Sequence, residues 1–259
     1  MPNRILKISD LNMFFGQTHA VNNVSFELYS GETMGIVGES GCGKTTLGRC
    51  IIRAYKATSG SVLYTADNGV EYDLQKIDKK ELRNLRKEIQ MIFQDPYSSL
   101  DPRMTVFDII SEPLRANFKG MPRSELEAKV SEMASKVGIN PSYLKRYPHA
   151  FSGGQRQRIG IARALILQPR LVICDEAVSA LDVSVQAQVI NLLKDLQDEM
   201  GLSYLFISHD LSVVDYISDR VIVMNAGCIV ECNTTDELFA DPQNEYTKTL
   251  LKAVPFIDF

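Results

Sequence analysis

The sequence predicts an α/β fold in which a parallel sheet, buried on both faces, is flanked by helices. Three continuous apolar runs, at Thr33–Val37, 171–174 and Ser203–Ile207, have the length and composition of strands covered on both sides. A helical pattern at Val183–Met200, with apolar residues three and four apart, lies between the second run and the third. With 259 residues, of which 45% are hydrophobic, the chain can bury one good core.

The other elements follow in chain order. Alternating residues at 5–15 and 24–29 indicate antiparallel strands at the N-terminus. The run at 79–88 carries charges of both signs, which is typical of a solvated amphipathic helix. A strand is expected at 89–93, and the turn residues near the C-terminus indicate a hairpin at 220–231.

The segment from Asp95 to Ala150 differs from the rest of the chain in its residue pattern. Helical patterns at 106–118 and 124–137 carry no buried-strand signal, and six prolines punctuate the segment. We therefore expect a single domain, residues 1–259, into which a helical subdomain is inserted at about 95–165.

Composition excludes several classes of protein. The 28 Lys and Arg against 32 Asp and Glu give a net charge of −4, which disfavours broad nucleic-acid binding. No window approaches 18 uncharged apolar residues, so the chain is not expected to cross a membrane. The N-terminus lacks the apolar core of a signal sequence, and the five cysteines form no paired ligand array, so a reducing, cytoplasmic location is expected.

A phosphate-binding loop follows the first apolar run. Residues 38–45 match G-x-x-x-x-G-K-[ST] in full, and a helix is expected to begin near Gly43. Glycines let the backbone turn its N–H groups toward phosphate oxygens, and the helix N-terminus adds a positive dipole end. Lys44 supplies a cation for the β- and γ-phosphates, and Thr45 a hydroxyl for Mg²⁺. The predicted ATP-binding residues here are Gly38, Glu39, Ser40, Gly41, Cys42, Gly43, Lys44, Thr45 and Thr46.

Two adjacent acids end the second apolar run. Asp175 and Glu176 follow residues 171–174. In a phosphate-loop protein, one acid at this place holds Mg²⁺ and a second can act on the attacking water. Successive side chains at a strand end point in different directions, so the two carboxylates can have separate roles.

One motif separates the classes of phosphate-loop protein. Phe151 and the residues Ser152, Gly153, Gly154 and Gln155 run directly into an amphipathic helix. This segment resembles the LSGGQ signature of the ATP-binding cassette (ABC) ATPase family, with Phe151 in place of Leu. The resemblance implies a P-loop NTPase (RecA-like) core with an N-terminal antiparallel β subdomain and an inserted α-helical subdomain. It also implies that the signature closes over ATP held by a partner subunit.

The resemblance assigns further residues. Gln94 looks like the Q-loop glutamine, which reaches Mg²⁺ together with Thr45 and Asp175. Glu176 corresponds to the catalytic carboxylate, and His209 looks like the switch histidine at the γ-phosphate. Ser179, Ala180, Leu181 and Asp182 look like the D-loop. Phe15 occupies the place of the aromatic that stacks on adenine, with Phe14 as the alternative.

A narrower resemblance concerns the oligopeptide, dipeptide and nickel importer subfamily. Segments 93–106, 178–188 and 238–251 are similar to its Q-loop, D-loop and tail regions. Ala177 departs from the proline common after the acidic pair, and the C-terminal extension of many members is not found after Phe259.

The subfamily implies an ATPase subunit, using ATP and Mg²⁺, on the cytoplasmic face of the cell membrane. The expected partners are a second ATPase subunit, identical or related, two transmembrane permease subunits and, indirectly, a solute-binding protein. The solute stays open. An exporter cassette, a soluble ABC ATPase and a non-hydrolysing nucleotide sensor are the competing hypotheses.

Overall fold

The central sheet has six strands in the computed structural model, which describes residues 3–95 and 99–252. Their order is β10-β9-β3-β8-β7-β6, and all neighbours pair in parallel except β10 with β9. The strands are β3 (Thr33–Val37), β6 (Ile89–Ile92), β7 (Leu171–Asp175), β8 (Ser203–Ile207), β9 (Arg220–Asn225) and β10 (Cys228–Thr234). The three apolar runs are thus strands of one parallel sheet, and the C-terminal hairpin is β9–β10.

A smaller antiparallel sheet packs beside it. Its order is β2-β1-β4-β5, formed by β1 (Arg4–Phe15), β2 (Thr18–Tyr29), β4 (Ser59–Thr65) and β5 (Glu71–Asp73). The alternating residues at 5–15 and 24–29 predict β1 and β2, whereas no pattern predicts β4 or β5. The first two residues of β4 are exposed Ser and Gly, and β5 has three residues, too few for a periodic pattern.

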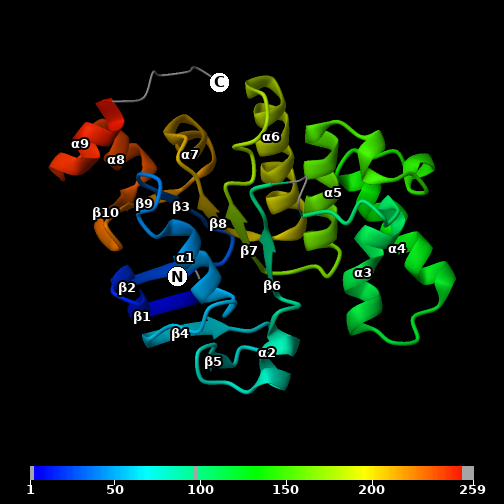
Figure 1. Cartoon of the computed structure of the whole chain (residues 1–259), viewed down its shortest axis with the longest axis horizontal. Helices are drawn as coiled ribbons and strands as arrows, with labels where there is room; N and C mark the ends of the chain where they lie inside the picture. The colour runs from blue at the N-terminus through cyan, green and yellow to red at the C-terminus, as the bar shows by residue number, and fades with distance from the viewer. Residues whose placement is uncertain (1–2, 96–98, 253–259) are drawn as a thin grey trace.

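Helices surround the two sheets (Figure 1). In Figure 1, α1 lies between the antiparallel sheet and the central sheet, and α3, α4 and α5, in green, group at one side of the molecule. The helices are α1 (Lys44–Ile51), α2 (Lys79–Leu85), α3 (Val106–Asn117), α4 (Arg123–Lys136), α5 (Gly153–Leu165), α6 (Val183–Met200), α7 (Leu211–Ile217), α8 (Thr235–Ala240) and α9 (Glu245–Lys252), with short 3₁₀ turns η1 (Pro141–Tyr143) and η2 (Pro148–Ala150).

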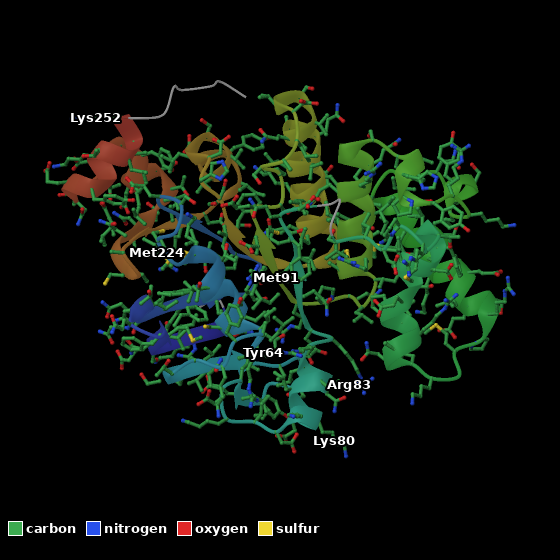
Figure 2. All side chains as sticks on the ribbon, viewed as in Figure 1. Tyr64, Lys80, Arg83, Met91, Met224 and Lys252 are labelled. Atoms are coloured by element: carbon green, nitrogen blue, oxygen red, sulfur yellow. The ribbon has the colours of Figure 1, made fainter. Side chains whose placement is uncertain are left out.

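The core forms two layers because side chains alternate along each strand. On β7, Leu171 and Ile173 join the layer that contains α1 and the antiparallel sheet, whereas Val172 and Cys174 join the layer under α5, α6 and α7. Met91 on the edge strand β6 and Met224 on β9, next to the other edge strand, are both labelled in Figure 2 and belong to the first layer. Strands buried on both faces explain the continuous apolar runs.

This architecture confirms the predicted fold class. The limits of the inserted helical subdomain, about 95–165, stay a prediction. Within the described residues, no helix combines the length and apolar character needed to cross a membrane. Because β3, β6, β7 and β8 are parallel, the loops that follow their carboxyl ends converge at one edge of the sheet, where ligands bind in α/β folds.

Candidate nucleotide-binding site

The loop between β3 and α1 needs glycine at two positions. Gly38 has φ 146°, and a Cβ there would lie 2.1 Å from the carbonyl oxygen of Met224. Gly43 has φ 108°, and a Cβ there would lie 2.1 Å from the carbonyl oxygen of Ala20. At both positions a neighbouring carbonyl oxygen leaves no room for a Cβ, so only glycine fits.

The ammonium group of Lys44 lies inside the curve of this loop. Its Nζ donates to the carbonyl oxygens of Gly38 at 2.7 Å and Glu39 at 2.9 Å, and the Cys42 Sγ lies 3.8 Å away. An ammonium has three donors, and these three acceptors match them. Although its side chain is long, Lys44 is only 5% exposed. The loop thus holds a buried cation at the start of α1.

Thr45 and Asp175 meet beside this cation. Thr45 Oγ1 donates to Asp175 Oδ1 at 2.7 Å. Burial raises the pKa of the Asp175 carboxyl, while the Thr45 hydroxyl and the Arg49 charge act against that rise. Hydroxyl and carboxylate oxygens are the ligands that Mg²⁺ prefers. The Thr45–Asp175 pair therefore fits Mg²⁺ by the chemistry of its oxygens.

The Glu176 carboxylate contacts two side chains that follow other strands of the sheet. Its backbone adopts φ 49°, which non-glycine residues rarely do, and its N–H donates to the Ile207 carbonyl at 2.9 Å. Its Oε2 accepts a hydrogen bond from Gln94 Nε2 at 2.6 Å and lies 3.3 Å from His209 Nδ1. Gln94 follows β6, Glu176 follows β7 and His209 follows β8, so the parallel sheet itself brings the three together.

These groups line one cavity of about 440 Å³. The lining residues are Ala20, Ser40, Gly41, Gly43, Lys44, Thr45, Thr46, Gln94, Glu176 and His209. Six of the ten belong to residues 38–46, and the buried Asp175 lies behind Thr45. Cations, backbone N–H groups and a carboxylate at one end give a site suited to a polyphosphate and an attacking water.

The signature residues lie elsewhere. Ser152 caps α5: its Oγ accepts from the Gln155 N–H at 3.3 Å, and Gln155 Oε1 accepts from the Ser152 N–H at 3.1 Å. Gly154 packs against α6, where a Cβ would lie 2.4 Å from Val185 Cγ1. Phe151, the departure from the family pattern, is buried. None of Ser152, Gly153, Gly154 and Gln155 lines the 440 Å³ cavity of its own chain.

The predicted D-loop connects Glu176 to α6. Ser179 Oγ donates to the Glu176 carbonyl at 3.1 Å, and Asp182 is the residue before the first turn of α6. Ala180 and Leu181 lie in the turn between them. Residues 96–98 of the segment after Gln94 lie outside the described residues.

The two candidate aromatic residues differ in their contacts. Phe14 stacks on His19 with ring centroids 3.8 Å apart, whereas Phe15 meets the edge of Tyr55 at 5.4 Å. Both are about equally exposed, at 44% and 45%. Neither lines the 440 Å³ cavity. The adenine contact of Phe15 stays a prediction, with Phe14 as its alternative.

Two contacts to the phosphate loop are absent from the sequence analysis. Ala20 on β2 lines the cavity. The Tyr246 hydroxyl on α9 accepts a hydrogen bond from the Glu39 N–H at 3.1 Å. Neither residue belongs to a recognisable sequence motif. Tyr246 also lies 207 positions from Glu39, so no local pattern links the two. Its only sequence signal is its place in the subfamily-like tail.

The chain is similar to known proteins over most of its length. The ABC transporter family model matches residues 21–179. The oligopeptide transport ATP-binding protein OppF of Bacillus subtilis (strain 168) is 53% identical over 262 residues, covering 100% of this chain and 85% of the relative. The dipeptide transport ATP-binding protein DppF of Lactococcus lactis subsp. cremoris (strain MG1363) is 49% identical over 264 residues, covering 99% of this chain and 83% of the relative.

A solved structure gives the same result for the fold. The dimeric post-hydrolysis state of the ATP-binding cassette MJ0796, bound to ADP and Pi, superposes with a TM-score of 0.77. Its sequence is 28% identical, and the match covers 89% of this chain and 99% of that one.

Proposed function

The chain belongs to the ABC transporter ATPase family, and from that premise we propose that it is the ATP-hydrolysing subunit of an importer for oligopeptides or dipeptides. The observation that carries the proposal is the convergence of Lys44, Gln94, Glu176 and His209 on one cavity. The relatives are named for oligopeptide and dipeptide transport, which supports the solute class.

In this mechanism different residues of the chain bind the phosphates and activate the attacking water. The loop glycines and Lys44 bind the phosphates, and the carboxylate of Glu176 orients or deprotonates the attacking water. Gln94 and His209 both contact the Glu176 carboxylate, so they fix its direction. Thr45, Gln94 and Asp175 would hold Mg²⁺, which neutralises charge that develops on the phosphates.

Hydrolysis requires a second cassette. The signature lies outside the cavity of its own chain, while its N–H groups at the N-terminus of α5 and its Ser152 hydroxyl are suited to an anion. Two subunits arranged head to tail would each supply the signature to the other's ATP. The dimeric cassette of the solved relative supports this arrangement.

A second cavity supports coupling to membrane subunits. It encloses about 540 Å³ between β6, α3 and α5, and it shares Gln94 and Asp175 with the nucleotide site while Glu112 and Arg163 line its helical side. Because α3 and Gln94 line the same cavity, a shift of Gln94 on hydrolysis would move α3. We infer that α3, α4 and α5 pass this motion to two permease subunits, which hold the ATPase on the cytoplasmic face of the membrane.

Reconstitution tests the proposal. The chain, its partner ATPase and the permeases would be placed in liposomes with the solute-binding protein, and ATP-driven uptake of labelled dipeptides, oligopeptides and nickel compared. We expect Mg-dependent ATP hydrolysis and uptake of peptide. Efflux of peptide would favour an exporter, and hydrolysis without any permease partner would favour a soluble ABC ATPase.

A further inference from the structure

One peptide group of the phosphate loop is held from both sides. The Gly38–Glu39 peptide presents its carbonyl oxygen to Lys44 Nζ at 2.7 Å. The N–H of the same peptide donates to the Tyr246 hydroxyl at 3.1 Å. Lys44 and Tyr246 therefore fix the plane of this peptide between them, although one begins α1 and the other lies on α9.

The position of Tyr246 is itself fixed. Its N–H donates to Asn244 Oδ1 at 2.9 Å, just before the helix. The Glu231 carboxylate on β10 accepts hydrogen bonds from the backbone N–H groups of Gln243 at 2.8 Å and Asn244 at 3.1 Å. The start of α9 is thus tied to the hairpin β9–β10 by charge-assisted bonds.

The same hairpin also contacts the loop directly. The Gly227 N–H donates to the Cys42 carbonyl at 3.0 Å, and the Met224 carbonyl oxygen would lie 2.1 Å from a Cβ at position 38. The C-terminal elements therefore contact the loop at Gly38, Glu39 and Cys42. Of these three contacts, the one at Glu39 is made by a side chain, that of Tyr246. A substitution of Tyr246 can therefore remove this contact without altering the backbone.

We propose that Tyr246 is a positioning residue for nucleotide binding, which acts on Lys44 through the Gly38–Glu39 peptide. When its hydroxyl accepts from the peptide N–H, the carbonyl on the other side of the peptide becomes a stronger acceptor for the ammonium group. The hydroxyl also stops this peptide from rotating. Both effects keep the Lys44 cation aimed at the site of the phosphates. The inference rests on the proposed ATPase function.

The variant Tyr246→Phe tests this proposal because it removes only the hydroxyl. We expect the Kd for ATP and the KM for hydrolysis to rise about three- to ten-fold, the range for one lost hydrogen bond. The kcat should stay within about two-fold, because the carboxylate of Glu176 is untouched. Because the bond is also present without nucleotide, the melting temperature of the free chain should fall by no more than about 4 °C.

Tyr216→Phe is the matched control. Its hydroxyl bonds Asn191 Oδ1 at 2.8 Å on the surface, so Kd and KM should not change. Glu231→Gln, which retains one oxygen for two N–H donors, should raise the Kd in the same direction but less than Tyr246→Phe does. Wild-type Kd and KM in Tyr246→Phe would overturn the proposal, and so would an equally raised Kd in Tyr216→Phe. Failure of the wild-type chain to bind ATP would instead overturn the proposed function.

Discussion

At the residue scale, the backbone and the side chain of Glu176 serve one purpose. The left-handed φ of 49° is costly for a residue with a Cβ, and it turns the chain so that the carboxylate meets Gln94 and His209. Asp175, one position earlier, points the other way, to Thr45. Two adjacent acids thus have different partners because a strand end separates their directions.

The variant Glu176→Gln should retain ATP binding and nearly abolish turnover. The amide keeps the size of the side chain but cannot accept a proton from water. We expect an ATP-bound dimer to accumulate, which size-exclusion chromatography with ATP would detect. Turnover at the wild-type rate would remove Glu176 from the catalytic role.

Asp175→Asn should raise the melting temperature while abolishing Mg-dependent hydrolysis. Burial raises the pKa of Asp175 above its ordinary value of 3.8, so the folded state binds this proton more tightly than the unfolded state does. Stability contributed by this group therefore falls as pH rises from that value, and at pH 7 the ionised carboxylate is destabilising. The gain in Asp175→Asn should shrink below pH 4. A lower melting temperature at pH 7 would contradict this account, and the wild type measured at both pH values is the control.

At the scale of elements, α5 joins two tasks at its N-terminus. The capping box of Ser152 and Gln155 stabilises the first turn, while Gly154 lets α6 approach closely. The signature is therefore also a packing motif. Its glycines serve the helix contact as well as the anion site.

Two glycines of α5 allow a matched comparison. Gly154→Ala should destabilise the fold by about 1–3 kcal/mol, because its Cβ would meet the β-branched Val185. Gly160→Ala, on the same helix with nothing within 4 Å of the added Cβ, should stabilise by about 0.5–1 kcal/mol. Denaturant unfolding measures both. Equal effects of the two substitutions would show that the α5–α6 approach does not depend on Gly154.

At the scale of the whole molecule, one chain holds half of each predicted ATP site. The cavity contains the phosphate loop, and the signature lies outside it. The proposed ATPase therefore needs a second chain to complete the site, and the α5 of that chain would face the first chain's loop.

Crosslinking tests this arrangement. A variant carrying Ser40→Cys and Ser152→Cys should form disulfide-linked dimers with ATP and few without it. Chains with either substitution alone are the controls, because they should form no such link. Absence of the linked dimer with ATP present would contradict the head-to-tail arrangement.

Motifs of local chemistry could be found in the sequence alone. The glycines and lysine of residues 38–45, the acidic pair 175–176 and the signature 152–155 are short, and their function requires particular residue types at fixed spacing. The parallel strands were equally visible, because burial on both faces leaves continuous apolar runs. The strands β4 and β5 were missed, since their pattern is short and partly exposed.

Contacts between distant segments could not be found in this way. Nothing local indicates that Gln94 bonds Glu176, that Ala20 restricts Gly43 or that Tyr246 reaches Glu39. Residue patterns were enough to predict the class of fold, the phosphate loop and the candidate groups of the site, because backbone periodicity and residue chemistry are local properties. Which groups meet, and which elements contact the loop, depends on the pairing of strands and the packing of α9, because these bring together residues far apart along the chain.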